Sequence, residues 1–195
     1  MVRVLDEDAC VQDSKLMFQD ERVVAAFHGS SSDRAATIVT LEEFAPSKND
    51  YDWLGHGVYF WEHAPLRAWQ WARQKYRERA CVVEARIALG RCLDLTDTRY
   101  TSALKLAYES LREAYIGGGR TLPVNRGKAR CLDCLVINYV AEYILPECDT
   151  VRAPFLEGEP IYDGSMLLTQ SHIQLVVRNK DCIVGGVRLL KPGVE

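Results

Sequence analysis

The sequence lacks several features that would define whole classes of protein. It has no apolar run near the ~18 residues that a membrane-spanning helix needs. Its first residues do not combine a basic stretch with an apolar one, as a secretory signal does. No internal repeat occurs, which argues against a solenoid. We therefore expect a cytoplasmic protein with no membrane partner.

Charge and cysteine content exclude further classes. The net charge of −3 gives no chain-wide electrostatic case for binding nucleic acid. The seven cysteines are odd in number and lie mostly in apolar segments, as reduced core thiols do. Cys131 and Cys134 form a single C-x-x-C motif, but no second such pair or H-x-x-x-H pair completes a zinc site. We expect no metal.

The 195 residues have the size of one domain, which we place at 1–195 with an irregular N-terminal arm at 1–20. Strand-like patterns at both ends enclose helical patterns in the middle, which predicts an α+β fold. The loop at 45–56 is polar, and Gly90 is expected to end a strand. Strands are predicted at 23–27, 57–61, 81–89, 150–155, 172–177 and 182–190, and helices at 34–39, 65–76, 104–115 and 132–144.

The first strand is the most informative segment. Its apolar run leads directly into His28, Gly29 and Ser30, where we expect the strand to end in a polar pocket. Glycine lets a flat ligand approach the backbone closely, and an imidazole and hydroxyl stand beside it. The amide of a nucleotide is the ligand that we expect there.

The strand at 172–177 provides a second polar face. Residues in a strand alternate between its two faces, so His172 and Gln174 share one face, while Ile173 and Leu175 share the other. If the apolar face packs in the core, a ligand can meet the histidine and the amide side by side.

These segments together resemble the ADP-ribosyltransferase superfamily, in the diphtheria-toxin-like branch that includes the poly-ADP-ribose polymerases. The motif order of that branch is H-G-[ST], then G-x-Y-F, then an acidic or polar residue on a late strand. Residues 157–162 and 172–174 also look like a small bacterial subfamily of toxin or phage-defence enzymes, for which a neutralising partner is expected. The matching residues are His28, Gly29, Ser30, Gly57, Val58, Tyr59, Phe60 and Gln174, with a helix rich in tryptophan and alanine after Tyr59.

The resemblance implies a split β-sandwich with helices inserted between the N- and C-terminal strands. It implies a mono-ADP-ribosyltransferase that uses NAD as its substrate, without a metal, and modifies a protein or nucleic acid. Nicotinamide leaves the ribose through a cationic transition state like that of glycoside cleavage. The Gly29 backbone would hold the carboxamide, His28 and Ser30 a ribose hydroxyl, and Tyr59 would stack on the nicotinamide ring. Gly57 and Phe60 complete the cofactor-binding motif.

Gln174 departs from the usual pattern, in which a glutamate occupies this position. An amide can hydrogen-bond a ribose hydroxyl but cannot act as a general base, so we expect NAD binding and cleavage but not chain elongation. His172 could supply a titrating group near pH 7. Glu159 or Glu157 could supply the titrating group instead. We rank Glu159 first, because Pro160 and the turn after it would fix the direction of the Glu159 side chain.

Two other interpretations remain open. The missing glutamate is also typical of a domain that has lost catalysis and only binds NAD or another protein. An RNA phosphate-transfer enzyme of the related fold would need basic phosphate ligands, for which Arg126, Lys128 and Arg130 are available. The acceptor of an ADP-ribosyl group is not indicated by any motif.

Overall fold

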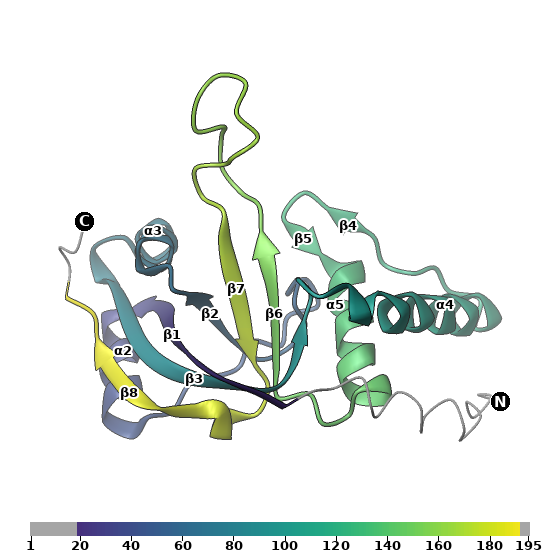
Figure 1. Ribbon diagram of the computed structural model, residues 1–195, viewed down its shortest axis with the longest axis horizontal. Coiled ribbons are helices and arrows are strands. Elements are labelled where there is room, and N and C mark those ends of the chain that lie inside the picture. The colour runs from purple at the N-terminus through teal and green to yellow at the C-terminus, as the bar shows by residue number, and fades with distance from the viewer. Residues whose placement is uncertain (1–18, 192–195) are drawn as a thin grey trace.

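The computed structural model describes residues 19–191, in which a central sheet carries helices at both ends (Figure 1). The helices are α2 (Ser32–Leu41), α3 (Pro65–Tyr76), α4 (Thr101–Gly117) and α5 (Cys131–Tyr139), which continues into a π-helical turn, η3 (Val140–Ile144). The strands are β1 (Gln19–Ser31), β2 (Val58–Glu62), β3 (Ala80–Asp94), β6 (Thr150–Phe155), β7 (His172–Val177) and β8 (Ile183–Leu189), with a separate hairpin of β4 (Asn125–Arg126) and β5 (Ala129–Arg130). Short 3-10 turns are η1 (Arg77–Arg79), η2 (Thr98–Tyr100) and η4 (Lys180–Cys182).

The six-stranded sheet has the order β1-β2-β7-β6-β3-β8, and β1 also pairs with β3. This extra pairing closes the sheet into a ring, with β8 added along β3. All pairs are antiparallel except β3 with β6. The α+β prediction is therefore confirmed. β1 and β2 pair only at Ala26–Glu62 and Phe27–Trp61.

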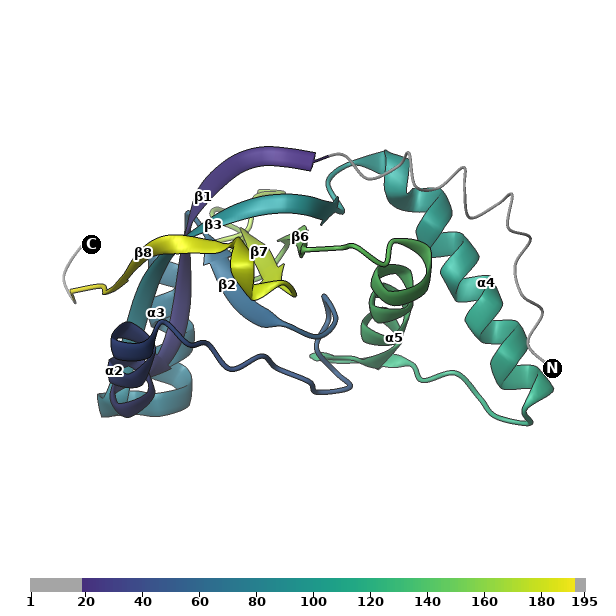
Figure 2. The same ribbon diagram turned by 90° about the horizontal axis from the view of Figure 1, so that it is seen from below.

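Three apolar clusters cover the sheet, and two of them lie on the same face. One packs α4, α5 and η3 against Val151, Ala153 and Val176. Another packs Ala68, Trp69 and Ala72 of α3 against Phe27 and Trp61. Figure 2 shows α2 and α3 at one end of the molecule and α4 and α5 at the other. The third cluster fills the opposite face, where Phe44 and α2 meet Val58, Phe60, Leu175 and Val177.

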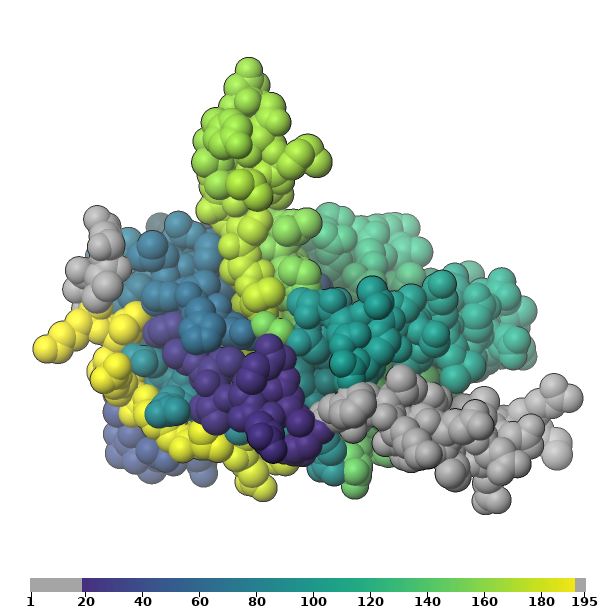
Figure 3. Space-filling view, viewed as in Figure 1, coloured from purple at the N-terminus to yellow at the C-terminus, as the bar shows by residue number. Residues whose placement is uncertain are grey.

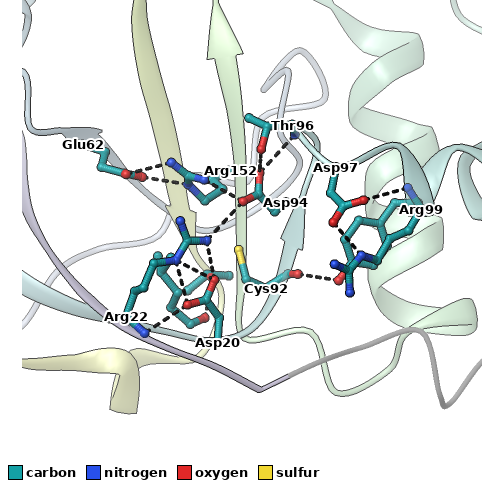
Figure 4. Close-up of polar contacts among 12 residues, drawn as sticks. Asp20, Arg22, Glu62, Cys92, Asp94, Thr96, Asp97, Arg99 and Arg152 are labelled. Atoms are coloured by element: carbon teal, nitrogen blue, oxygen red, sulfur yellow. Dashed lines mark hydrogen bonds and ion pairs between the residues drawn. The ribbon is translucent and has the colours of Figure 1, made fainter.

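An ion-pair network ties four strands together near one end of the sheet (Figure 4). Arg152 of β6 donates two hydrogen bonds of 2.8 Å to the Glu62 carboxylate of β2 and one of 2.6 Å to Asp94 of β3. Arg22 of β1 joins Asp94 to Asp20. The side chains of Arg152 and Glu62 are only 9% and 8% exposed. Each buried charge therefore needs the other to offset the cost of its lost hydration.

Most predicted elements are confirmed within a few residues, but three details differ from the predictions or lie outside the described residues. β1 ends at Ser31, one residue beyond the predicted His28–Ser30 end, but its last residues pair with β3 and Ser30 is buried, so this end does not open into a polar pocket. β3 does not end at Gly90, which takes a positive φ of 61° beside Asp149 and lets the strand run on to Asp94. The predicted irregular arm lies outside the described residues at 1–18, whereas residues 19–20 belong to β1.

Two further searches concern the described residues alone. No helix within 19–191 has the length and apolarity to span a membrane. In the same range, no three histidine, cysteine or acidic side chains gather where a metal ion could be held. Of the C-x-x-C pair, Cys134 is buried and burial raises the pKa of its thiol to about 11, so the thiol stays protonated at neutral pH.

Candidate functional site

A pocket of about 840 Å³ lies between the α3 cluster and the α4–α5 cluster. Neither group of helices covers the middle of the sheet there, so side chains of β2, β6 and β7 form the floor. Residues from the loop at 45–56 and from the β4–β5 hairpin complete the walls. The space is within the range of pockets that bind small ligands, roughly 300–1,000 Å³.

Aromatic rings form a continuous surface across this pocket. Trp53 packs on Phe155 with their ring centroids 4.7 Å apart, and Phe155 lies 5.4 Å from the His172 ring. Trp61 continues the surface, at 6.3 Å from His172 and 5.4 Å from Trp71. Such a surface can hold a flat ring by stacking.

His172 and Gln174 stand side by side on this floor, as the alternation along the strand predicts. The Nδ1 atom of His172 bonds the Gln170 carbonyl at 2.7 Å, and a carbonyl can only accept, so Nδ1 carries the proton. Burial lowers the pKa of His172, and its Nε2 is therefore a hydrogen-bond acceptor at neutral pH. The Gln174 amide oxygen accepts from the Trp53 indole, which fixes the side chain in the pocket.

Three buried polar atoms in the described residues have no hydrogen-bond partner, and all three belong to residues that line this pocket. They are Trp61 Nε1, Arg67 Nε and His172 Nε2. Buried polar atoms are almost always paired, since an unpaired one costs about 1–3 kcal/mol. Two N–H donors and one acceptor without a partner, on three residues that line one pocket, favour a polar ligand there.

The charges around the pocket are mainly positive. Arg67 forms a 2.6 Å ion pair with Glu157. The remaining cations that line the pocket are Lys75, Lys128 and Arg130, and none of them makes an ion pair with a described residue. The local field therefore favours an anionic ligand, although the whole chain carries a net charge of −3.

His28 lies on the face of the sheet opposite to His172 and Gln174. Its ring packs against Phe44 and Phe60, with centroids 5.5 and 5.7 Å apart. Its Nδ1 donates to the Tyr59 carbonyl at 2.8 Å, which bridges β1 and β2 beyond the point where they pair. Burial lowers the pKa of His28, so the ring is neutral at pH 7.

Gly29 lies directly behind the wall of the pocket. A Cβ atom at this position would be 2.8 Å from Cε3 of Trp71 and 3.0 Å from the Ala68 carbonyl oxygen. Only glycine therefore lets α3 pack this closely against β1. Ser30 is buried, with 1% of its surface exposed, and does not line the pocket.

Tyr59 lies on the same face as Gln174, but its ring packs into the cluster beneath α5. Its hydroxyl donates to the Gly55 carbonyl at 2.8 Å and accepts from the Leu54 N–H at 3.0 Å. Burial raises its pKa. These hydrogen bonds fix the turn that follows Trp53. Tyr59 therefore positions the pocket wall but does not itself line the pocket.

The other predicted residues are also separated by the fold. Gly57 packs so closely on β7 that a Cβ would be 2.6 Å from the Val177 carbonyl oxygen, and Phe60 is fully buried on the opposite face. Glu159 is exposed and does not line the pocket, whereas Glu157 lines it and pairs with Arg67. The geometry thus favours Glu157 over Glu159.

The contribution of α3 to the pocket was not among the predictions. Five of its residues line the pocket at the spacing of one helical face, and the sequence of this helix contains no acidic residue. The opposite face carries Ala68, Trp69 and Ala72, which pack on the sheet. The sequence already contained this signal: a helix with one apolar face and one face of basic, amide and aromatic residues. The five residues are Arg67, Gln70, Trp71, Gln74 and Lys75.

No protein-family model matches the chain. A curated protein of Methanocaldococcus jannaschii, described only as uncharacterized, is 29% identical to it over 123 residues. The match covers 58% of this chain and 54% of the relative. The chain therefore spans about half the length of the curated relative that it matches, and that relative's description names no activity.

Proposed function

We propose that this protein is an NAD-dependent mono-ADP-ribosyltransferase and that NAD binds in the pocket beside α3. The observation that carries the proposal is that three buried, unpartnered polar atoms, Trp61 Nε1, Arg67 Nε and His172 Nε2, belong to residues that line one aromatic and cationic pocket. Gln174 lines the same pocket. The finer assignment of the fold, a split β-sandwich of the ADP-ribosyltransferase type, belongs to the same proposal. The divergence of β1 and β2 beyond the Phe27–Trp61 pair, toward His28 on β1 and Phe60 on β2, supports it.

The chemistry of NAD fits these residues. Its nicotinamide and adenine rings are flat and suit the tryptophan surface, its ribose hydroxyls and carboxamide can pair with the unpartnered atoms, and its diphosphate suits the cations. Pocket volume agrees as well, because a dinucleotide needs a large cleft of the order observed, about 840 Å³.

In the proposed reaction the bond between ribose C1′ and the nicotinamide nitrogen breaks. Its electron pair leaves with nicotinamide, which becomes neutral, and the developing cation on the ribose is shielded by the aromatic walls. A nucleophile of the acceptor forms the new bond to C1′. Its proton passes to His172 Nε2, which is unprotonated at neutral pH because burial lowers its pKa. The Gln174 amide orients a ribose hydroxyl.

Release of nicotinamide from NAD tests this proposal. The wild type is expected to release nicotinamide, and Gln174→Leu and His172→Asn should each reduce the rate at least about tenfold, since a positioned acid or base contributes roughly 10²–10⁴. His63→Asn is the matched control, because His63 is exposed and outside the pocket. A wild-type rate no higher than that of a variant carrying both Gln174→Leu and His172→Asn, with and without cell extract as acceptor, would leave only a non-catalytic binding domain.

A further inference from the structure

Resting on that proposed function, we infer that the acceptor is a single-stranded nucleic acid, which the β4–β5 hairpin and α3 hold across the mouth of the pocket. In Figure 1 these two elements stand on either side of the β6–β7 pair. Both contribute residues to the same pocket.

The charge of the pocket exceeds what NAD needs. Arg67 is neutralised by Glu157, which leaves Lys75, Lys128 and Arg130 without an ion pair in the described residues. The diphosphate of NAD carries two negative charges. Arg126, exposed on the same hairpin, adds a further cation, and residues 125–130 include no acidic residue. Additional phosphates are therefore favoured beside the dinucleotide.

The hairpin presents its cations on a fixed backbone. Gly127, with a positive φ of 55°, and Lys128 form a two-residue turn between the paired residues Arg126 and Ala129. The Asn125 side-chain oxygen accepts from the N–H groups of Leu132 and Asp133, so the hairpin is anchored to the first turn of α5. Cations that are already positioned lose less entropy when they bind a phosphate backbone.

The α3 face supplies groups that can contact bases. Gln70 and Gln74 lie one turn apart beside Trp71 on the face toward the pocket. Amides can pair with base edges, and an indole can stack on any base. A groove that combines cations with exposed aromatic rings is typical of single-strand binding. An acidic protein would use the cations but gain nothing from this combination of amides and indole.

The C1′–nicotinamide bond breaks with its electron pair on nicotinamide, and a nitrogen or oxygen atom of the nucleic acid forms the bond to C1′. The proton of that atom passes to His172 Nε2. No oxidant or reductant is involved, and NAD is the source of the ADP-ribosyl group.

Binding of a fluorescent single strand of about 12 nucleotides, a length within the usual site sizes, tests the inference without NAD. We expect R126Q/K128Q/R130Q to weaken binding roughly 10- to 100-fold at 0.1 M salt and to make the slope of log K against log[salt] shallower by about 2, or about 0.7 per contact. K105Q/R112Q/K180Q, with the same charge change outside the pocket, is the control and should keep the wild-type slope. Radiolabel from NAD should appear on the strand.

The outcomes separate the two proposals. Nicotinamide release without binding of the strand, or equal binding of a polyglutamate peptide, would overturn the nucleic-acid acceptor and leave the NAD-cleaving enzyme intact. Strand binding that depends on the hairpin, without nicotinamide release, would overturn the enzyme and leave a nucleic-acid-binding protein. Equal losses in the two triple variants would show that the hairpin has no special role.

Discussion

Single residues in this protein decide how closely its elements can approach. Gly29 is the clearest case, because the Trp71 ring and the Ala68 carbonyl occupy the space where a side chain would be. We expected the space beside Gly29 to admit a ligand. In the structure α3 occupies that space instead. Its position still matters for the pocket, since Trp71 lines it.

We expect Gly29→Ala to push Trp71 and α3 away from β1. The substitution should lower the free energy of unfolding by about 1–3 kcal/mol, as overpacking does, and should weaken NAD binding. Urea unfolding followed by tryptophan fluorescence measures the first effect. Gly117→Ala is the control: a Cβ there meets nothing within 4 Å, and alanine favours the helix. Equal stabilities of the two variants would contradict the packing argument.

The residues at the site could be predicted from the sequence only in part. His172 and Gln174 were found because strand alternation is local and fixes which side chains share a face. His28 was placed with them, although the fold puts its ring on the opposite face. That separation depends on how β1 pairs with β2 and β3, which is long-range pairing that a local pattern does not contain.

At the scale of elements, local patterns predicted the strands and helices well and their ends less well. Gly90 is a strand breaker by propensity, yet β3 continues because Asp149 accepts from the Arg91 N–H at 3.0 Å and β6 pairs beyond it. Such contacts join residues that are far apart in the sequence. The ion-pair network of Arg152 is invisible in the sequence for the same reason.

This network gives a prediction for the strands that it joins. Arg152→Met should cost about 3–5 kcal/mol in unfolding free energy, because Glu62 is then buried without a partner. Removing both charges with Glu62→Gln and Arg152→Met should recover much of that loss. Arg188→Met, at a pair whose arginine is 71% exposed, should cost no more than about 1 kcal/mol. Chemical denaturation compares the three variants, and equal costs for the two arginines would show that burial of the Glu62 pair is unimportant.

The pH dependence of this network follows from Asp94. Burial raises its pKa, but hydrogen bonds from Thr96 and Arg152 lower it by more, so the folded pKa is below the ordinary value. The contribution of this carboxylate to stability is therefore complete above the unfolded pKa of about 4 and is lost as the pH falls through the folded pKa.

At the scale of the whole molecule, the pocket results from two groups of helices that cover one face of the sheet without meeting. Above it, residues 156–171 project as a lobe, with Met166 94% exposed (Figure 3). Neither the gap nor its contents can be inferred from a single element, since Trp53, Trp61, Trp71 and Phe155 come from four separate segments. This pocket is where we propose that NAD binds.

Thermal unfolding with increasing NAD tests that claim most directly. NAD should stabilise the wild type by about 2.7 kcal/mol at a concentration of 100 times Kd. Trp61→Phe keeps an aromatic ring but removes the unpartnered Nε1 donor, so Kd should rise roughly 5- to 10-fold. Trp69→Phe, outside the pocket, should keep the full shift. An unfolding temperature that NAD leaves unchanged, or an equal shift in wild type and both variants, would contradict the account.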